Sequence, residues 1–122
     1  MGSYAGVRVL VVEDSEDQAG LLRKYLERAG CTVTTTCSAE DAILAYGREV
    51  PDLAIIDLRL PGMDGATLAA QLHRDCPTCA IAITSVLDES DFPPADASLP
   101  KPFTGAQVRQ VLSDTIPHWN AL

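Results

Sequence analysis

Basic residues are scarce in this sequence, which has nine Lys and Arg residues against seventeen Asp and Glu residues. The formal net charge is therefore −8 at pH 7. A chain of this sign is repelled by a nucleic-acid backbone and by an anionic membrane, so we expect neither as a direct partner. The excess of carboxylates instead suits a metal cation or a protein partner with a basic surface.

Long apolar runs are also absent. No segment approaches the ~20 consecutive apolar residues that a membrane-spanning helix needs. Residues 1–4 lack the basic and apolar regions of a secretion signal. Cysteines in a chain without such a signal indicate reduced thiols, so we expect a cytoplasmic protein. The four cysteines are Cys31, Cys37, Cys76 and Cys79.

Internal repeats, low-complexity tracts and linkers are missing as well. The chain has 122 residues, the length of one ordinary domain. Apolar residues make up 47% and charged residues 21%, which is typical of a folded globular protein. We expect a single domain over residues 1–122, with its core at about 6–117.

Apolar segments of strand length alternate with segments of helical periodicity. The predicted strands are 7–12, 32–36, 53–57, 80–84 and 97–99. Helices are predicted after the N-cap residues Ser15 and Ser38, after the turn cluster 61–65 and after Thr104, and Gln18 and Gln107 would complete capping boxes. We expect Gly30 to end the first helix and Ala42, Leu44, Ala45 and Val50 to form the apolar face of the second. This alternation predicts a three-layer α/β/α sandwich around a parallel sheet.

The segment 85–96 breaks the alternation. It contains adjacent prolines, Pro93 and Pro94, and several acidic residues. Such a composition does not support a stable helix. We therefore predict a loop with at most one short turn, at a place where the alternation would otherwise require a helix.

Polar residues end the predicted strands. Glu13 and Asp14 follow the first strand, Asp57 ends the third, Thr84 ends the fourth, and Lys101 comes just after the fifth. The carboxyl ends of parallel strands share one edge of a sheet, so these side chains should converge. Clustered carboxylates repel one another unless a cation joins them, and Mg²⁺ prefers oxygen ligands. The set suits an aspartate that attacks phosphorus while a lysine and a hydroxyl bind the phosphoryl oxygens.

In this order and spacing, four motifs resemble the receiver domains of bacterial two-component response regulators. The motifs are Val-Val-Glu13-Asp14, Asp57-Leu-Arg-Leu-Pro-Gly-Met-Asp-Gly65, Ile-Thr84-Ser85 and Lys101-Pro-Phe103. The likeness covers residues 7–117. It implies one receiver domain with the doubly wound, flavodoxin-like (CheY-like) fold and a five-stranded parallel sheet. The usual fourth helix, between Thr84 and Lys101, would be shortened or replaced by a loop.

The resemblance also implies roles for the converging residues. Asp57 would be the phosphoacceptor. Asp14 and Asp57 would bind Mg²⁺ (or Mn²⁺) directly, Glu13 would act through bound water, and the backbone carbonyl of Arg59 would complete the metal shell. Lys101 would be the positive partner of the phosphoryl group. By the same likeness, the peptide bond between Lys101 and the next residue, a proline, would be cis.

The switch region implied by the resemblance contains Thr84, Ser85 and Ser98. Thr84 would be the hydroxyl that follows the phosphoryl group. Receivers usually carry Tyr or Phe three residues before the lysine, and this chain has Ser98 there. We expect phosphorylation to pull Thr84 inward and to order residues 85–97.

The partners implied by the resemblance are a histidine kinase or a histidine phosphotransfer protein, and an output domain or effector outside this chain. On the first predicted helix, Gln18, Leu21 and Leu22 are the candidate docking residues. The domain would act as a signalling switch and not as an enzyme, because it promotes only its own phosphorylation and dephosphorylation.

Other functions fit the sequence less well. Haloacid-dehalogenase-like phosphatases use an Asp nucleophile but need a second Asp two residues later, where this chain has Arg59. A flavodoxin-like phosphate-binding module needs a loop rich in Ser, Thr and Gly after the first strand, where this chain is acidic.

The Cys76-Pro-Thr-Cys79 motif raises a further alternative, a redox or zinc module. A redox pair of this spacing normally opens a helix, whereas this pair follows a helical stretch and precedes a strand. Cys31 and Cys37 lie at opposite ends of a predicted strand, ~20 Å apart, so they cannot complete a zinc site. We therefore interpret Cys76 and Cys79 as ordinary thiols in a connection.

Overall fold

Five parallel strands form the centre of the computed structural model, which describes residues 4–116. The strands are β1 (Arg8–Val12), β2 (Thr32–Thr36), β3 (Leu53–Asp57), β4 (Ala80–Ser85) and β5 (Ala97–Pro100). They lie in the order β2-β1-β3-β4-β5. All five strands agree with the predicted segments to within one residue at each end. Residues 1–3 and 117–122, at the two ends of the predicted domain, lie outside the described part of the chain.

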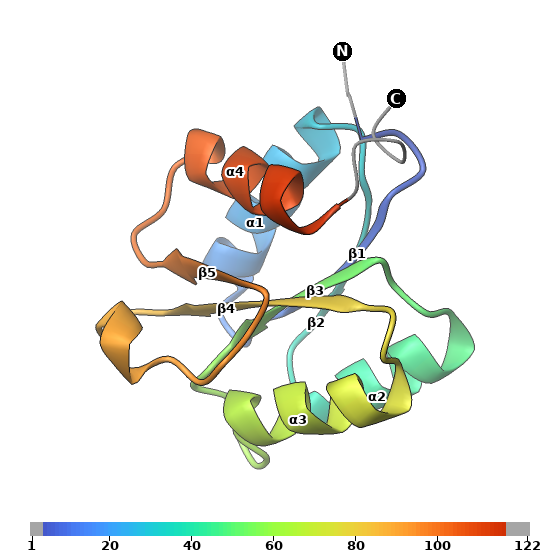
Figure 1. The fold of residues 1–122 in the computed structure, drawn as a ribbon, viewed down its shortest axis with the longest axis vertical. Helices are drawn as coiled ribbons and strands as arrows, with labels where there is room; N and C mark the ends of the chain where they lie inside the picture. Colours follow the sequence, from blue (N-terminus) through green and yellow to red (C-terminus); the bar gives the residue numbers. More distant parts are fainter. Residues whose placement is uncertain (1–3, 117–122) are drawn as a thin grey trace.

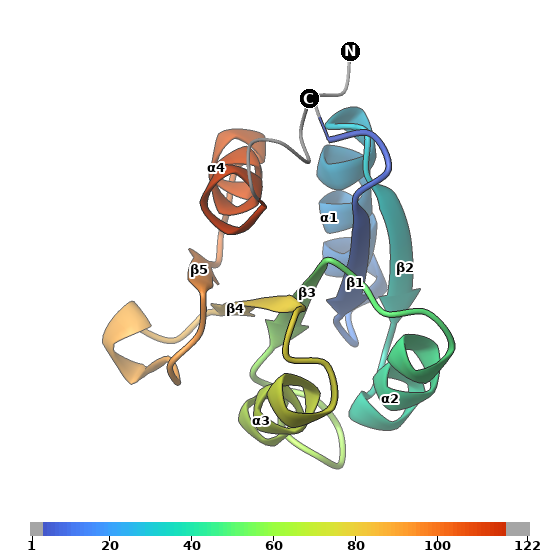
Figure 2. The same cartoon turned by 45° about the vertical axis from the view of Figure 1, so that its right-hand side comes forward.

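Two helices cover each face of the sheet (Figures 1 and 2). The helices are α1 (Glu16–Arg28), α2 (Ala39–Arg48), α3 (Gly65–Asp75) and α4 (Gly105–Thr115). Helices α1 and α4 pack on one face, and α2 and α3 pack on the other. The predicted three-layer α/β/α sandwich is confirmed. None of the helices in residues 4–116 has the length and hydropathy that crossing a bilayer requires.

Side-chain caps begin the helices where the sequence predicts them. Ser15 and Ser38 accept hydrogen bonds from backbone amides in the first turns of α1 and α2. Thr104 and Gln107 form the predicted capping box of α4. At α1 only half of the predicted box forms, because the backbone amide of Ser15 donates to Glu13 Oε2 at 3.2 Å.

The core consists of two clusters, one on each side of the sheet. Alternate residues of β1 face opposite sides, so Val9 and Val11 pack under α1 and α4 while Leu10 and Val12 pack under α2 and α3. Every residue of β3 is buried, as expected of a central parallel strand covered on both faces.

The apolar face of α2 differs from the prediction. Ala42 is buried, but Leu44 is 61% exposed and Val50 is 49% exposed. Tyr46 takes the inner position, four residues after Ala42, and its hydroxyl donates to Asp75 Oδ2 at 2.6 Å. The polar end of Tyr46 therefore joins α2 to the end of α3.

The connection between β4 and β5 contains one turn of 3-10 helix, η1 (Glu89–Asp91), and no α-helix. The predicted loop with one short turn is therefore confirmed. We call residues 86–96 the strap. It lies beside β4 and β5 at the edge of the sheet (orange in Figure 1). Within the strap, the half-buried ring of Phe92 packs against the core cluster on the α2 and α3 side.

Candidate functional site

Three carboxylates meet at the carboxyl ends of the central strands. Glu13 and Asp14 follow β1, and Asp57 is the last residue of β3. One oxygen of each side chain lies within 4.8 Å of an oxygen of the other two. Glu13 and Asp57 are buried and Asp14 is exposed. The structure thus brings together the three side chains that the sequence places at this edge.

Lys101 joins two of these carboxylates. Its Nζ lies 2.5 Å from Glu13 Oε1 and 2.9 Å from Asp57 Oδ2. The peptide bond between Lys101 and Pro102 is cis, as expected. The backbone amide of Lys101 donates to the carbonyl of Ser85 at 2.8 Å, which fixes the lysine beside the end of β4.

The electrostatics of the cluster show an excess of negative charge. Burial raises the pKa of Glu13 to about 7, and Asp57 adds to this rise, although Lys101 and the amide of Ser15 oppose it. Burial opposes the charge of Lys101, but its hydrogen bonds to Glu13 and Asp57 raise its pKa. Three carboxylates, of which Lys101 contacts two, form a set of oxygen donors that a divalent cation such as Mg²⁺ fits.

The carboxylate of Asp57 is oriented by its own loop. Its Oδ1 accepts a hydrogen bond from the backbone amide of Arg59 at 3.0 Å. The other oxygen, Oδ2, contacts Lys101. The side chain of Arg59 is exposed, so Arg59 contacts Asp57 through its backbone.

Gly65 packs against the backbone of Asp57, a contact that the sequence analysis missed. It is the first residue of α3, and a Cβ built on it would lie 2.1 Å from the carbonyl oxygen of Asp57. Any larger residue would therefore displace α3 or the end of β3. The sequence contains a signal, since Gly65 ends the turn cluster after Asp57, but turn chemistry alone does not reveal this contact.

Thr84 lies beside Asp57 on the neighbouring strand. The two residues are register partners on β4 and β3. The Thr84 side chain is fully buried, and its hydroxyl donates to the carbonyl of Leu99 at 2.7 Å. In this structure the hydroxyl is therefore bonded to β5.

The other two residues of the predicted switch region contact the strap. Ser85 is buried, and its Oγ accepts a hydrogen bond from the amide of Leu87 at 3.2 Å. Ser98 is half-buried on β5, and its Oγ donates to Glu89 Oε2 at 2.6 Å.

The predicted docking residues on α1 need one correction. Gln18 and Leu21 are half-buried and reach the surface. Leu22 is fully buried in the core under α1. It lies four residues before the buried Leu26, on the face of the helix that packs against the sheet, so the prediction of a surface contact is wrong for Leu22.

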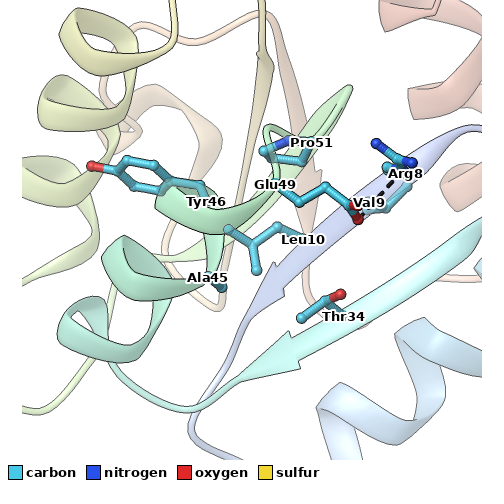
Figure 3. Close-up of a pocket in the computed structure, with 8 residues that line it drawn as sticks. All are labelled: Arg8, Val9, Leu10, Thr34, Ala45, Tyr46, Glu49 and Pro51. Carbon is cyan, nitrogen blue, oxygen red and sulfur yellow. Dashed lines mark ion pairs between the residues drawn. The ribbon is translucent and has the colours of Figure 1, made fainter.

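Two hollows lie at opposite edges of the sheet, and one of them lies next to the carboxylates. A solvent-open hollow of about 390 Å³ lies directly beside Glu13 and Asp14, between the ends of β1 and β2. A smaller cavity of about 40 Å³ lies at the start of β1, next to Tyr46, where an ion pair of 3.4 Å joins Arg8 and Glu49 (Figure 3). The smaller cavity is at the opposite edge of the sheet from the carboxylates.

Cys76 and Cys79 have the environment of structural thiols. Cys76 caps the end of α3, and Cys79 directly precedes β4. Both are free and buried. Burial, with a contribution from Cys76, raises the pKa of the Cys79 thiol to about 12, and its Sγ donates to the carbonyl of Ala80. A redox pair needs an accessible thiolate, so this environment argues against the redox alternative.

Comparisons with known proteins agree with this geometry. The family model of the response regulator receiver domain matches residues 9–113. The transcriptional regulatory protein BaeR of Escherichia coli O6:H1 is 39% identical over 85 residues, which cover 69% of this chain and 35% of BaeR. A protein-glutamate methylesterase/protein-glutamine glutaminase of Natronomonas pharaonis is 32% identical over 88 residues, which cover 71% of this chain and 25% of that protein.

A solved structure extends the comparison to the fold. The response regulator receiver domain (CheY-like) from Methylobacillus flagellatus superposes with a TM-score of 0.81 at 28% identity. The match covers 89% of this chain and 98% of that chain. This chain therefore spans nearly all of an isolated receiver domain but less than half of each of the two curated relatives.

Proposed function

Because this chain belongs to the family of response regulator receiver domains of two-component signalling, we propose that Asp57 accepts the phosphoryl group in this protein. The supporting observation is the position of Asp57, buried at the end of β3 between the ammonium of Lys101 and two other carboxylates. In the reaction, the bond between phosphorus and the donor's histidine nitrogen breaks as a bond to a carboxylate oxygen of Asp57 forms. The released imidazole nitrogen takes up a proton.

Receiver domains bind Mg²⁺ through an acidic cluster, and the donor set of this chain fits that ion. Asp14 and Asp57 would hold Mg²⁺ or Mn²⁺ directly, Glu13 would act through water, and the backbone carbonyl of Arg59 would complete the shell. The cation supplies charge neutralisation at the phosphoryl oxygens. Lys101 supplies a second positive charge, and Asp57 presents the attacking oxygen.

The position of Thr84 supports a role in switching. Its hydroxyl donates to the carbonyl of Leu99, while its backbone pairs with Asp57. A phosphoryl group on Asp57 offers this hydroxyl a charged acceptor, and bonds to charged acceptors are stronger than bonds to neutral carbonyls. Thr84 then moves inward, away from β5, and residues 85–97 become ordered in response.

The partners follow from the same proposal. A histidine kinase or a histidine phosphotransfer protein donates the phosphoryl group, in the cytoplasm, and docks on α1 near Gln18 and Leu21. Residues 1–122 form one receiver domain that acts as a switch, without turnover of an external substrate. The output is an effector or domain outside these residues.

Replacement of the phosphoacceptor tests the proposal directly. We expect Asp57→Asn to abolish Mg²⁺-dependent labelling of the protein by radioactive acetyl phosphate, because the amide cannot attack phosphorus. Asp64→Asn is the matched control, since Asp64 is the exposed N-cap of α3 in the same loop and Asn caps helices equally well. Labelling of Asp57→Asn at another residue, to the level of the unmodified protein, would refute the assignment.

A further inference from the structure

The strap is held to the rest of the protein by few contacts. None of its residues, 86–96, is buried. The N-cap residue of its turn, Asp88, makes no side-chain capping bond. Within the described chain, Phe92 is the one strap residue packed against a core cluster. Few apolar groups therefore stabilise the position of the strap, and individual hydrogen bonds matter more.

Backbone amides donate the hydrogen bonds that fix the two ends of the strap. At the beginning, the amide of Leu87 donates to Ser85 Oγ at 3.2 Å. At the end, the amide of Asp96 donates to the carbonyl of Ile81 at 2.9 Å, and Asp96 Oδ2 accepts from the amide of Ile81 at 2.8 Å. The turn η1 lies between these anchored ends.

A single side-chain hydrogen bond fastens this turn to the sheet in residues 4–116. Ser98 on β5 donates to Glu89 Oε2 in η1 at 2.6 Å. Ser98 is the register partner of Ile83, which belongs to the core cluster on the α2 and α3 side, so Ser98 lies over the face on which Phe92 packs. The bond therefore holds the turn against that face of the sheet edge.

The same stretch of β5 also contacts the candidate site. Leu99 directly follows Ser98, and its carbonyl accepts the hydroxyl of Thr84 at 2.7 Å. Thr84 is in turn the register partner of Asp57. On β5, Ser98 is thus bonded to the strap, and the next residue, Leu99, is bonded to the hydroxyl of Thr84 beside Asp57.

We propose that the hydrogen bond between Ser98 and Glu89 is a latch through which a chemical change at Asp57 reaches the strap. This coupling rests on the proposed function of Asp57 and Thr84. When Thr84 leaves the buried carbonyl of Leu99, β5 adjusts to satisfy that carbonyl, and Ser98 moves with it. The small side chain of Ser98 transmits the movement through its bond to one carboxylate.

The latch itself is tested without any phosphoryl donor. The amides of Asp91 and Phe92 are bonded to the carbonyls of Asp88 and Glu89, so their hydrogen exchange reports opening of η1. We expect roughly threefold to tenfold faster exchange in Ser98→Ala, the effect of losing one hydrogen bond.

Two variants serve as controls for this measurement. Ser98→Thr keeps the hydroxyl on a strand residue and should exchange at the original rate. Ser90→Ala removes an exposed hydroxyl of the same turn and should also leave the rate unchanged. Equal exchange rates in Ser98→Ala and the unmodified protein would overturn the latch.

The coupling is tested with Mg²⁺ and beryllofluoride, an analogue of the phosphoryl group. In the unmodified protein and in Ser98→Thr, we expect slower exchange both at the amide of Thr84 and at those of Asp91 and Phe92. In Ser98→Ala, only the amide of Thr84 should respond. A full response of the strap in Ser98→Ala would overturn the coupling.

The two proposals fail in different ways. Failure of Thr84 to respond to beryllofluoride in the unmodified protein would contradict the proposed function and, with it, the coupling. The exchange rates measured without beryllofluoride would still decide whether Ser98 holds the strap.

Discussion

At the scale of single residues, the geometry of the site depends on a glycine, Gly65, as well as on the charged side chains. Gly65 lets the first turn of α3 lie against the carbonyl of Asp57, a place that no Cβ can occupy. The hydrogen bond from the amide of Gly65 to the carbonyl of Leu58, at 3.1 Å, closes the loop between them. The backbone that carries Asp57 is therefore packed directly against α3.

Gly65→Ala should lower the free energy of unfolding and slow the labelling of Asp57. The added methyl group collides with backbone, which cannot rotate away, so we expect a loss of about 1–3 kcal/mol, as for overpacked cores. Urea unfolding and the initial rate of labelling by acetyl phosphate measure the two effects.

Gly20→Ala is the matched control for Gly65. Gly20 lies within α1, and a Cβ there would meet nothing within 4 Å. We expect this variant to be more stable by about 0.5–1 kcal/mol, because Ala favours helix over Gly. Equal stability of Gly65→Ala and the unmodified protein would show that the contact with Asp57 is not restrictive.

At the scale of elements, prediction from sequence succeeds where a local pattern has one solution. The strands follow from short apolar runs, and Ser15, Ser38 and Thr104 cap helices through contacts three residues away. Faces are harder to predict than elements. Leu44 is apolar but exposed, because it lies on the side of α2 opposite the buried Ala42 and Tyr46.

In the site, too, some features follow from local sequence patterns and others depend on contacts between elements. The convergence of Glu13, Asp14, Asp57 and Lys101 could be predicted, because the carboxyl ends of parallel strands share one edge of the sheet. The bond of Thr84 to the carbonyl of Leu99 depends on how β5 lies beside β4, and the sequence does not encode that contact in any local pattern.

Thr104→Ala should lower the free energy of unfolding by about 1 kcal/mol, because it removes the hydrogen bond from the amide of Gln107 to the Thr104 hydroxyl in the capping box of α4. Labelling of Asp57 should be unchanged, since the cap does not contact the carboxylates. Chemical unfolding and the labelling assay measure both quantities. Ser113→Ala, an exposed position within the same helix, is the control and should not destabilise the protein. A loss of equal size in both variants would contradict the role of the cap.

At the scale of the whole molecule, the chain is negatively charged, and several of its carboxylates are gathered at the site. The net charge is −8, and in residues 4–116 three carboxylates with oxygens within 4.8 Å of one another lie at one edge of the sheet. Gathering like charges opposes folding unless protons or cations compensate them. Global stability should therefore respond to pH and to divalent cations through this cluster.

The pH dependence can be assigned to Glu13. Its pKa is raised from 4.5 to about 7 in the folded protein, so folding takes up a proton between these values. The protonated Glu13 therefore contributes to the free energy of unfolding. This contribution is complete below pH 4.5 and is lost as the pH rises through 7. In Glu13→Gln this loss is absent. Without divalent cations, the variant should gain on the order of 1–3 kcal/mol relative to the unmodified protein between pH 5 and 8.

Urea unfolding at several pH values measures this difference. Adding Mg²⁺ should reduce it, because a cation beside Glu13 favours the charged carboxylate and lowers its pKa. Glu27→Gln, at an exposed position of α1, is the control and should follow the pH profile of the unmodified protein. Parallel profiles for Glu13→Gln and the unmodified protein would contradict the assignment.

The strand order β2-β1-β3-β4-β5 has a consequence for how tolerant this architecture is to rearrangement. After β1, the chain first adds a strand on one flank of the sheet and then builds outward on the opposite flank. The loops that leave β1 and β3 consequently run to α1 and α3 on opposite faces of the sheet (Figure 1), and the carboxylates of Glu13, Asp14 and Asp57 lie where these loops part. This divergence depends on the winding of the sheet and not on chain continuity. A circularly permuted chain, cut in the connection between α2 and β3, would therefore retain it.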